Sequence, residues 1–509
     1  MPIAILSVYD KSGLLDFARA LREQGWSLLA SGGTARLLRD SGCAVTEVAD
    51  YTGSPEILGG RVKTLHPAIH GGLLARDAPA DRAELKALGW ETIDLVAVNL
   101  YPFEQTVAAP GVTLEDAVEN IDIGGVTLIR AAAKNFERVT LVSDPSDYSS
   151  VLSELRAGGI SAATRRRLAL KGFQQTAHYD HAIQDYLAHL PGANGPEGGE
   201  PPLTVTVFRS QALRYGENPH QPAELYSEAR GVGPLGGQVL QGKELSYNNL
   251  LDLDAAWRAA LSFERPTICI VKHLSPCGIA SAGDLASAYA AAFACDTRSA
   301  YGGVIASNRL FDDEAARALG DLFVECIAAP GFSDGARQVL AGRKNCRLLS
   351  IPDQTPASGF ELRSITRGLL RQAVDRGDPA GAKWRVVSRR APTDAEWQTL
   401  RFAWRACQHV KSNAIVLAQG EATVGIGGGQ PNRVDCARMA VERAGERARG
   451  SVMASDAFFP FPDSVEVGAA AGVTAVVHPG GSVRDAESLA AADAAGMAMV
   501  VTGVRHFRH

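Results

Sequence analysis

Lysine is rare in this sequence, and several lysines stand where a titratable cation could take part in catalysis. Of the 51 basic residues in the chain of 509, 10 are Lys and 41 are Arg. Arginine stays protonated in proteins, whereas a desolvated lysine can lose its proton and act as acid or base. Codon bias explains the shortage. Half of the lysines nevertheless lie in polar segments that carry other reactive side chains: Lys11, Lys63, Lys134, Lys272 and Lys411.

A Lys–His pair, Lys272 and His273, directly follows the apolar run of residues 267–271. The ammonium of Lys272 disfavours a second positive charge beside it, so it favours the neutral imidazole that a general base needs. The alternative is a structural histidine, which is the commoner role of a single His. Taken by itself, the pair is therefore a candidate catalytic site only.

Three glycine-flanked loops in the first part of the chain could hold a phosphate. Residues 31–34 (Ser-Gly-Gly-Thr) stand between an apolar run and a helical segment, where backbone N–H groups at a helix N-terminus can meet an anion. Residues 10–13 (Asp-Lys-Ser-Gly) follow the first apolar run, and residues 59–67 contain Arg61, Lys63 and Thr64. Each loop alone could be an ordinary turn. Together they predict one phosphorylated ligand at the carboxyl ends of the strands.

A set of acid–base candidates accompanies these loops. Tyr101 ends a strong strand pattern, Asp122 opens a helical pattern, and Lys134 lies three turns further along that helix. With Lys63, these groups could move protons at a carbonyl or amide. The alternatives are that Asp122 is only a helix N-cap and Lys134 only a solvated cation.

Short apolar runs alternating with amphipathic segments predict how these residues are positioned. Residues 3–8, 27–30, 95–100 and 139–142 are strand candidates, followed by helical patterns at 14–21, 35–38, 114–121 and 148–155. That alternation predicts a parallel sheet with helices on both faces. A helix from about 162 to 190 precedes a segment rich in Pro and Gly, residues 191–202. We therefore expect a first domain at 1–190, a linker at 191–202 and a second domain at 203–509.

The second part of the chain also shows an α/β pattern. Strands are expected at 267–271, 304–307, 415–418, 423–426 and 474–477, with helices such as 285–294, 397–407 and 436–448. Polar segments lie at 214–221, 411–413 and 430–433, next to several of these elements. Each segment could be an ordinary loop. In combination they predict a second site at strand ends.

Composition and missing motifs exclude several functions. A net charge of −5 gives no general attraction to nucleic acid or acidic membranes. The chain has no P-loop signature, and Gln430 replaces the last glycine of a G-x-G-x-x-G pattern, which disfavours an ATPase or dehydrogenase. His66 and His70 have Pro67 between them, and His178 with His181 lacks a nearby third ligand, so no catalytic metal is expected.

The cysteine spacing and the apolar pattern indicate in which cellular compartment the protein is expected. The eight cysteines are scattered without a C-x-x-C pair, so neither a disulfide framework nor a zinc ribbon is indicated. No apolar stretch reaches the length of a membrane span, and the N-terminus lacks a basic leader pattern. We expect a cytoplasmic protein without membrane or nucleic-acid partners.

Several motifs, in this order, resemble the bifunctional purine biosynthesis family that joins 5-aminoimidazole-4-carboxamide ribonucleotide (AICAR) formyltransferase to IMP cyclohydrolase. They are residues 31–34, 60–67 (Gly-Arg-Val-Lys-Thr-Leu-His-Pro), 99–103 (Asn-Leu-Tyr-Pro-Phe), 122–125 (Asp-Ile-Gly-Gly), 130–134, 214–221, 271–273, 411–413 and 457–461 (Ala-Phe-Phe-Pro-Phe). The resemblance implies a methylglyoxal-synthase-like first domain that cyclises formyl-AICAR. It also implies a larger cytidine-deaminase-like second domain, without the deaminase metal, that transfers the formyl group.

The resemblance also implies residue roles. In the first domain Lys134 is the proton-transfer residue, with Lys63, Tyr101 and Asp122 around it. The nucleotide contacts there are Tyr9, Asp10, Lys11, Ser31, Gly32, Gly33, Thr34, Arg61, Val62, Thr64, Asn99 and Leu100. In the second domain His273 is the general base and Lys272 stabilises the transition state. The substrate contacts there are Arg214, Tyr215, Gly302, Glu325, Asn413, Arg433, Phe458 and Arg505. Two departures, Tyr301 for the usual Phe and Glu325 for the Asp of some members, affect only the fine placement of AICAR.

The expected partners follow from the same resemblance. They are the small molecules AICAR, formyl-AICAR and IMP, with 10-formyltetrahydrofolate as folate cosubstrate, and a second copy of the chain in a homodimer with shared transferase sites. Two alternatives remain open at this point. One is a nucleotide-sensing regulatory module, in which Lys63, Tyr101 and Lys134 would be superfluous; the other is a phosphosugar lyase.

Overall fold

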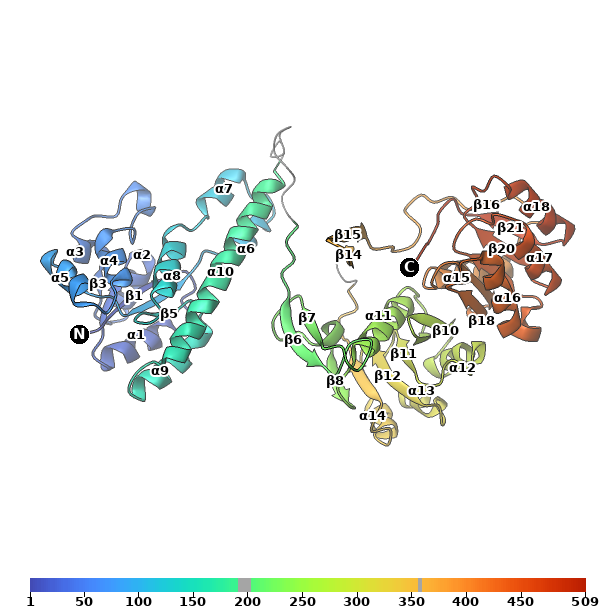
Figure 1. Cartoon of the computed structure of the whole chain (residues 1–509), viewed down its shortest axis with the longest axis horizontal. Coiled ribbons are helices and arrows are strands. Elements are labelled where there is room, and N and C mark those ends of the chain that lie inside the picture. The colour runs from blue at the N-terminus through green and yellow to red at the C-terminus, as the bar shows by residue number, and fades with distance from the viewer. Residues whose placement is uncertain (191–202, 356–358) are drawn as a thin grey trace. The chain divides into compact units, whose positions relative to one another are not determined.

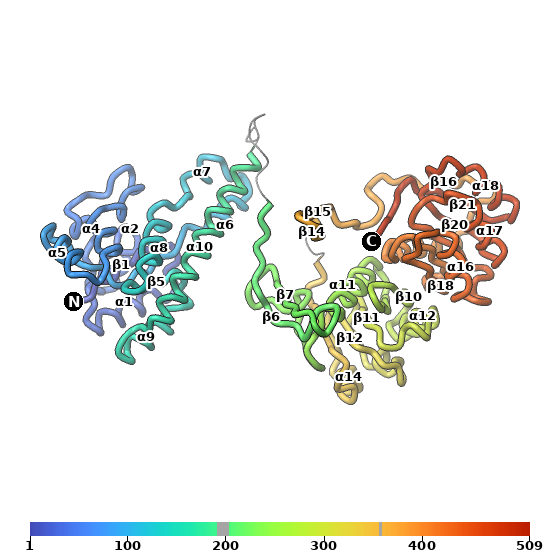
Figure 2. The backbone as a smooth tube through the Cα atoms, in the orientation of Figure 1, coloured from blue at the N-terminus to red at the C-terminus, as the bar shows by residue number. Residues whose placement is uncertain are grey.

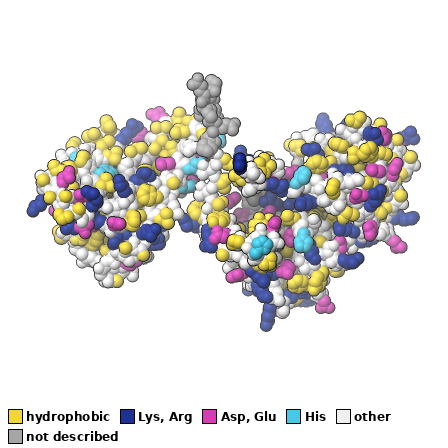
Figure 3. All heavy atoms as spheres, in the orientation of Figure 1, with side chains coloured by type: hydrophobic (Ala, Val, Ile, Leu, Met, Phe, Trp, Pro, Cys, Tyr) yellow, Lys and Arg dark blue, Asp and Glu magenta, His cyan; other side chains and the backbone are white. Residues whose placement is uncertain are grey.

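Residues 1–190, 203–355 and 359–509 are described by the computed structural model drawn in Figures 1 and 2. The chain divides into two units, Met1–Thr204 and Val205–His509, with the N-terminus in the first and the C-terminus in the second. The predicted linker, 191–202, lies outside the described residues. On the face drawn in Figure 3, basic and acidic side chains are interspersed, in keeping with the small net charge of −5.

The first unit is built on a parallel sheet with strand order β3-β2-β1-β4-β5. Its strands are β1 (Ile3–Val8), β2 (Ser27–Ala30), β3 (Thr46–Glu47), β4 (Leu95–Asn99) and β5 (Thr140–Val142). The predicted parallel sheet is thus confirmed, and the four expected strands end within one residue of their predicted bounds. Strand β3 was not predicted, because two residues are too short to show a pattern.

Helices cover both faces of this sheet, as the alternation of apolar segments predicted. They are α1 (Leu14–Glu23), α2 (Gly32–Asp40), α3 (Val48–Thr52), α4 (Pro67–Leu74), α5 (Pro79–Ala87), α6 (Phe103–Val107), α7 (Leu114–Glu119), α8 (Gly124–Lys134), α9 (Tyr148–Arg156) and α10 (Ala162–Ala188), with 3₁₀ turns at Leu58–Gly60 and Pro145–Asp147. Alternate residues of β1 enter two cores: Leu6 packs with α1 and α9, and Ile5 with α4 and α8. The long helix α10 packs along α8 and β5 (Figure 1).

The second unit contains a mixed sheet in the order β16-β21-β20-β19-β17-β18-β10-β9-β11-β12-β13-β8. These strands are β8 (Gln238–Gln241), β9 (Thr267–Lys272), β10 (Ser275–Ser281), β11 (Gly303–Ser307), β12 (Val324–Ala329), β13 (Arg347–Ser350), β16 (Arg385–Val386), β17 (Ala414–Gln419), β18 (Ala422–Gly428), β19 (Val452–Ser455), β20 (Ala475–His478) and β21 (Ala498–Val501). Two hairpins stand beside it, β6 (Phe208–Leu213) with β7 (Ala223–Ser227) and β14 (Phe360–Ile365) with β15 (Gly368–Ala373).

Helices again cover both faces of the sheet. Helices α11 (Tyr247–Leu261) and α15 (Asp394–Cys407) share one core on one face. The other face carries α12 (Leu285–Cys295), α13 (Asp313–Ala318), α14 (Asp334–Leu340), α16 (Arg433–Ala444), α17 (Asp463–Ala470) and α18 (Asp485–Ala494). Short 3₁₀ turns lie at Pro234–Gly236 and Gly445–Ala448. The α/β class is therefore confirmed for the larger unit as well.

The eight cysteines are distributed through these cores as buried thiols. Burial raises the pKa of every one of them, because a thiolate is poorly stabilised away from water. Each therefore acts as a small apolar side chain in its core.

Candidate active sites

Three strands of the first unit end at the same edge. Strands β2, β1 and β4 are parallel neighbours, so their carboxyl ends meet there. Tyr9, Asp10 and Lys11 follow β1, residues 31–34 follow β2, and Leu100 and Tyr101 follow β4. This edge therefore gathers the residues from three separate motifs.

Asn99 joins two of these strand ends. Its Oδ1 accepts the backbone N–H groups of Tyr9 and Asp10 at 2.6 and 2.9 Å, and its Nδ2 donates to the carbonyl of Asp10 at 2.9 Å. The rings of Tyr9 and Tyr101 meet edge to face, with centroids 5.4 Å apart. Thr34 Oγ1 is 3.2 Å from both the nitrogen and the oxygen of Val8, which ties the second loop to β1.

The Ser-Gly-Gly-Thr loop faces an ammonium group. Ser31 is extended and precedes α2, and Gly32 has a φ of 53°. A Cβ at Gly32 would lie 2.9 Å from Lys63 Nζ, and the left-handed φ of this residue favours glycine. Lys63 Nζ also lies 3.3 Å from Glu56 Oε2. The positive end of the α2 dipole and this cation together suit a phosphate.

Asp122 stands at the start of α8 beside the same edge. Its Oδ1 accepts the N–H of Gly125 at 2.7 Å, so the helix-capping interaction expected as an alternative is present. Burial raises the pKa of Asp122, while hydrogen bonds from the backbone N–H groups of Gly125 and Tyr101 oppose the rise. A carboxyl group with a raised pKa suits proton transfer, so capping and acid–base chemistry are compatible here.

The remaining predicted nucleotide contacts lie around these groups. A Cβ at Gly124 would be 3.3 Å from Thr64 Oγ1, and one at Gly125 would be 2.9 Å from Leu100 Cδ2, which places both Thr64 and Leu100 at the start of α8. Val62 pairs with Ile57 in an isolated bridge. Arg61 is exposed and forms an ion pair with Glu119 of α7.

Lys134 lies apart from this group. It is the last residue of α8, about 15 Å along the helix from Gly124. The next residue, Asn135, donates to the carbonyls of Leu73 and Ala75, and Thr140 donates to Asp94, just before β4 begins. Lys134 is therefore at the amino edge of the sheet, opposite the edge that gathers the other predicted residues.

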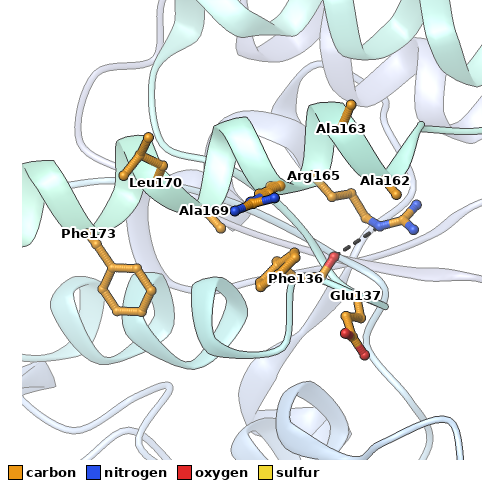
Figure 4. Close-up of a pocket in the computed structure, with 9 residues that line it drawn as sticks. Phe136, Glu137, Ala162, Ala163, Arg165, Ala169, Leu170 and Phe173 are labelled. Atoms are coloured by element: carbon orange, nitrogen blue, oxygen red, sulfur yellow. Dashed lines mark hydrogen bonds between the residues drawn. The ribbon is translucent and has the colours of Figure 1, made fainter.

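A shallow hollow lies near this end of α8 (Figure 4). Its walls come from the segment after α8 and the first half of α10, and they are Phe136, Glu137, Ala162, Ala163, Arg165, Arg166, Ala169, Leu170 and Phe173. Arg165 Nε donates to the carbonyl of Phe136 at 3.0 Å, which fixes one wall. None of the predicted site residues lines this hollow.

In the second unit, strand register brings distant motifs to a single edge. Val271 pairs with Val304, Gly303 with Val324, and Ala414 with Gly428. Ile415 also pairs with Ser455, and His478 with Val501. The predicted residues next to these pairs therefore share an edge: Lys272, His273, Gly302, Glu325, Asn413, Arg433, Phe458 and Arg505.

The Lys272–His273 pair lies at an unusual hairpin turn. Lys272 pairs with Ser275, so His273 and Leu274 are the two turn residues, with φ of 55° and 61°. Such turns normally contain Asn or Gly, because a left-handed conformation costs other residues about 1–2 kcal/mol each. Asp252 of α11 accepts the N–H of His273 at 3.1 Å and that of Leu274 at 2.7 Å. Backbone strain of this kind, held by a specific acceptor, is typical of functional sites.

Lys272 points toward the next strand. Its Nζ donates to the carbonyl of Tyr301 at 2.8 Å, directly before Gly302. Gly302 has a φ of 72° and donates to the carbonyl of Phe323, which brings β12 and Glu325 close. Glu325 forms an ion pair with Arg347 of β13, whose side chain is 6% exposed. Arg347 therefore holds the carboxylate of Glu325 in place.

Asn413 and Arg433 belong to one buried network. Arg433 Nη2 donates to Asn413 Oδ1 at 2.7 Å, and its Nη1 forms an ion pair with Asp456, a fully buried carboxylate. Asp456 also accepts the N–H of Ala414 at 3.1 Å. Ser412 donates to the same carboxylate and joins Asn413 through a cis peptide bond.

The remaining predicted contacts are more exposed. Arg214 lies over the ring of Tyr215 at 5.2 Å, and the carbonyl of Tyr215 accepts the N–H of Tyr247 at the start of α11. Arg505 lies over Phe507 at 4.4 Å. In the Phe-rich segment, Phe459 is fully buried, whereas Phe458 and Phe461 are 39% and 49% exposed, so the rings available to a ligand are those of Phe458 and Phe461.

Sequence reasoning missed several residues that hold these sites. Glu56, Asp252, Arg347 and Asp456 each contact a predicted site residue through a carboxylate or guanidinium, and Tyr179 contacts Asp122 through its hydroxyl. Asp252 and Tyr179 lie within helices, where helical periodicity does not distinguish them from other side chains.

Within the described ranges, no group of three or more His, Cys, Asp or Glu could hold a metal. No helix in those ranges is long and apolar enough to cross a membrane.

Comparison with known proteins gives two family matches. A model described as the AICARFT/IMPCHase bienzyme matches residues 132–443, and one described as the MGS-like domain matches residues 13–127. The second match ends before α10 begins. The parallel sheet and the MGS-like match together confirm the methylglyoxal-synthase-like class of the first unit.

Full-length relatives share about half of the sequence. A "Bifunctional purine biosynthesis protein PurH" from Cyanothece sp. is 51% identical over 515 residues and covers 100% of both chains. A protein of the same name from Sorangium cellulosum is 52% identical over 523 residues, covering 99% of each. A solved structure, "Crystal structure of ForH", is 40% identical, covers 36% of this chain and 97% of its own, and has a TM-score of 0.33.

Proposed function

Because the chain belongs to the AICARFT/IMPCHase bienzyme family, we propose that its two activities are divided between its two structural units. Membership makes the protein a bifunctional purine biosynthesis enzyme with AICAR formyltransferase and IMP cyclohydrolase activity. The sensing-module and phosphosugar-lyase alternatives have no support in these matches, which include full-length bifunctional relatives. We assign cyclisation to the first unit and formyl transfer to the second.

The cyclisation assignment is supported by the group at the carboxyl edge of the first sheet. We propose that the ribose phosphate binds residues 31–34 beside Lys63, with Thr64, Asn99 and Leu100 around the rest of the nucleotide. Binding there would orient formyl-AICAR so that its carboxamide nitrogen reaches the formyl carbon. The observation that carries this proposal is the approach of Lys63 Nζ to Gly32 at the N-terminus of α2.

Ring closure needs protons to move in both directions. The carboxamide nitrogen loses a proton as its bond to the formyl carbon forms. The 5-amino nitrogen then loses its proton and becomes doubly bonded to that carbon, while the bond from carbon to the former formyl oxygen breaks and this oxygen, having gained two protons, leaves as water. We assign these transfers to Asp122, Tyr101 and Lys63, which border the proposed phosphate site; the raised pKa of Asp122 suits a group that takes up and gives back a proton. Lys134 lies at the opposite edge of the sheet, so we propose that it serves the site of a partner subunit.

For formyl transfer we propose His273 as general base and Lys272 as the transition-state stabiliser. The 5-amino group of AICAR is a poor nucleophile, because its lone pair is delocalised into the imidazole ring and carboxamide. His273 takes the amino proton as the new nitrogen–carbon bond forms. Lys272 supports negative charge on the formyl oxygen or protonates the folate nitrogen as its bond to the formyl carbon breaks. The strained turn that presents His273 supports this assignment.

The finer assignments follow from the family. We propose 10-formyltetrahydrofolate as the cosubstrate and AICAR as the ligand of Arg214, Tyr215, Gly302, Glu325, Asn413, Arg433, Phe458 and Arg505. We also propose a cytoplasmic homodimer whose transferase sites combine residues of both subunits. Sizing in solution and the dependence of transferase activity on protein concentration test the dimer.

The division of activities is tested with one variant in each unit. Purified protein receives AICAR with 10-formyltetrahydrofolate, or formyl-AICAR alone, and IMP is measured. Lys272→Ala should abolish IMP formation from AICAR while formyl-AICAR is still cyclised. Lys63→Ala should lose cyclisation while formyl-AICAR accumulates from AICAR. If either variant lost both activities while remaining folded, the assignment of its site would be wrong.

A further inference from the structure

The C-terminal half of α10 packs onto the two segments that carry Tyr101 and Asp122. Tyr179 is 7% exposed and forms a small core with Phe103 and Ala117. The ring of Phe103 meets that of Tyr179 at 6.2 Å and that of Tyr186 at 5.7 Å, both edge to face. Phe103 in turn donates its backbone N–H to the carbonyl of Tyr101 at 2.9 Å. The helix thus holds the segment that presents Tyr101.

The hydroxyl of Tyr179 holds the other segment. It accepts the backbone N–H of Asp122 at 2.8 Å and donates to the carbonyl of Asn120 at 3.1 Å. One oxygen atom therefore satisfies two backbone groups on either side of Ile121. Asp122 can then accept the N–H of Gly125 and start α8 with its carboxyl group at the proposed site.

The packing and the hydrogen bonds of Tyr179 have different functions. Ring packing needs only an apolar aromatic side chain, which Phe would supply. The hydroxyl adds nothing to that core and costs free energy to bury unless it is bonded. Both of its bonds go to the backbone that carries Asp122. Moreover, α10 follows the end of the MGS-like match, so this contact comes from a part of the chain that the MGS-like model does not cover.

We propose that Tyr179 is a positioning residue of the cyclohydrolase reaction, whose hydroxyl fixes the backbone at Asp122 so that the carboxyl group meets formyl-AICAR. The inference rests on the proposed role of Asp122 in cyclisation. Tyr179 itself touches no reacting atom. Its hydroxyl acts through Asp122 and contributes nothing to formyl transfer in the second unit.

The test compares two hydroxyl deletions on the same helix in the full-length protein. Tyr179→Phe keeps the ring and removes both bonds; Tyr186→Phe removes a hydroxyl that has no hydrogen-bond partner among the described residues and keeps its contact with Phe103. Asp122→Asn tests the underlying role. Cyclisation of formyl-AICAR is measured as kcat and KM, formyl transfer as disappearance of AICAR, and backbone opening as amide hydrogen exchange of residues 120–125.

Tyr179→Phe should lower the kcat of cyclisation by roughly tenfold, the size expected when a buried N–H loses its acceptor, with KM and formyl transfer nearly unchanged. Hydrogen exchange of residues 120–125 should quicken, while Tyr186→Phe matches wild type in every measurement. The pH dependence of kcat for cyclisation is a further test of the effect on Asp122. Water admitted to Asp122 stabilises its charged form, so the acidic limb of the kcat profile should move to lower pH.

Three results would each overturn the inference. If Asp122→Asn abolishes cyclisation but Tyr179→Phe retains full kcat and an unchanged pH profile, Tyr179 is only a packing residue and the proposed function stands. If Tyr179→Phe loses both activities together, its role is general stability and the positioning role is wrong. Full cyclisation by Asp122→Asn would instead refute the proposed role of Asp122, and this inference with it.

Discussion

Asp252 Oδ1 accepts the backbone N–H of Leu274 at 2.7 Å, while its other oxygen accepts that of His273 at 3.1 Å. Both turn residues are left-handed without being glycine. Asp252 belongs to α11, a helix of 15 residues that begins with a capping box formed by Ser246 and Asn249. The transferase turn is therefore held from outside the hairpin that forms it.

Replacing Asp252 with Asn should impair formyl transfer and spare cyclisation. The amide keeps the size of the side chain but has one acceptor oxygen instead of two, so the turn can relax and carry His273 away. A loss of roughly tenfold in kcat for transfer is expected, which corresponds to about 1.4 kcal/mol. Cyclisation of formyl-AICAR, measured on the same preparation, is the internal control.

A second substitution that relieves the backbone strain of the His273–Leu274 turn tests why Asp252→Asn loses formyl transfer. Adding Leu274→Gly to Asp252→Asn should restore part of the transfer activity, because glycine adopts a positive φ freely. Leu274→Ala removes most of the same packing without that freedom, so it should restore nothing. Equal behaviour of the two double variants would show that Asp252 does not act through the turn.

The two glycines of the proposed phosphate loop should respond differently to alanine. Gly32→Ala places a Cβ 2.9 Å from Lys63 Nζ at a φ of 53°, whereas a Cβ at Gly33 has only Lys11 Cε at 4.0 Å. Gly32→Ala should therefore raise the KM for formyl-AICAR at least tenfold, and Gly33→Ala should change it little. Steady-state cyclisation kinetics decide, and a larger effect at Gly33 would contradict the proposed position of the phosphate.

Lys134 and Lys63 should complement each other across a dimer. Lys63→Ala and Lys134→Ala homodimers should each be inactive in cyclisation. After the two proteins are unfolded together and refolded, about a quarter of wild-type activity should return, because half of the dimers are mixed and each mixed dimer has one complete site. Absence of recovery, with mixed dimers verified by affinity tags, would show that Lys134 does not serve a partner's site.

The C-terminal segment should lose stability at alkaline pH through His506. Burial alone would lower its pKa, but hydrogen bonds to Asp375 at 2.6 Å and Asp378 at 3.0 Å outweigh burial and raise it. The imidazolium therefore stabilises the folded protein fully below its ordinary pKa of about 6.5, and the contribution disappears as pH rises through the raised folded value.

Urea midpoints measured from pH 6 to pH 9 should fall for the wild type and fall less for His506→Gln. Asp375, Asp378 and His409 are the other charged or titratable groups that act on this ring, and Arg508 and Arg405 act on His409. His409 has a pKa lowered to about 3 by burial, so it is neutral throughout that range and does not account for the change. Parallel curves for the two proteins would contradict the assignment.

Periodicity predicted much of this structure. The strands at 3–8 and 27–30 and the helix from about 162 follow directly from apolar spacing, and so does the α/β class of both units. Motif order also identified the family. Parallel topology then explains why the loops after β1, β2 and β4 meet, since their carboxyl ends share an edge.

The features that the sequence did not predict depend on contacts between residues far apart in the chain. The sequence placed Lys134 near Asp122 on one helix, yet eleven helical residues carry it to the opposite edge of the sheet. The φ values of His273 and Leu274 leave no trace in a sequence that lacks Asn and Gly at the turn. Asp252 and Tyr179 act across 21 and 57 residues of chain, and helical periodicity predicts only which face they occupy.

The uniformly buried cysteines make this chain convenient for spectroscopy. Since every native thiol is shielded and has a raised pKa, alkylating reagents should react slowly with the folded wild type. A cysteine introduced at an exposed position would then be labelled selectively without prior removal of the native eight. A fluorophore or spin label introduced in this way beside either proposed site could report ligand binding at that site.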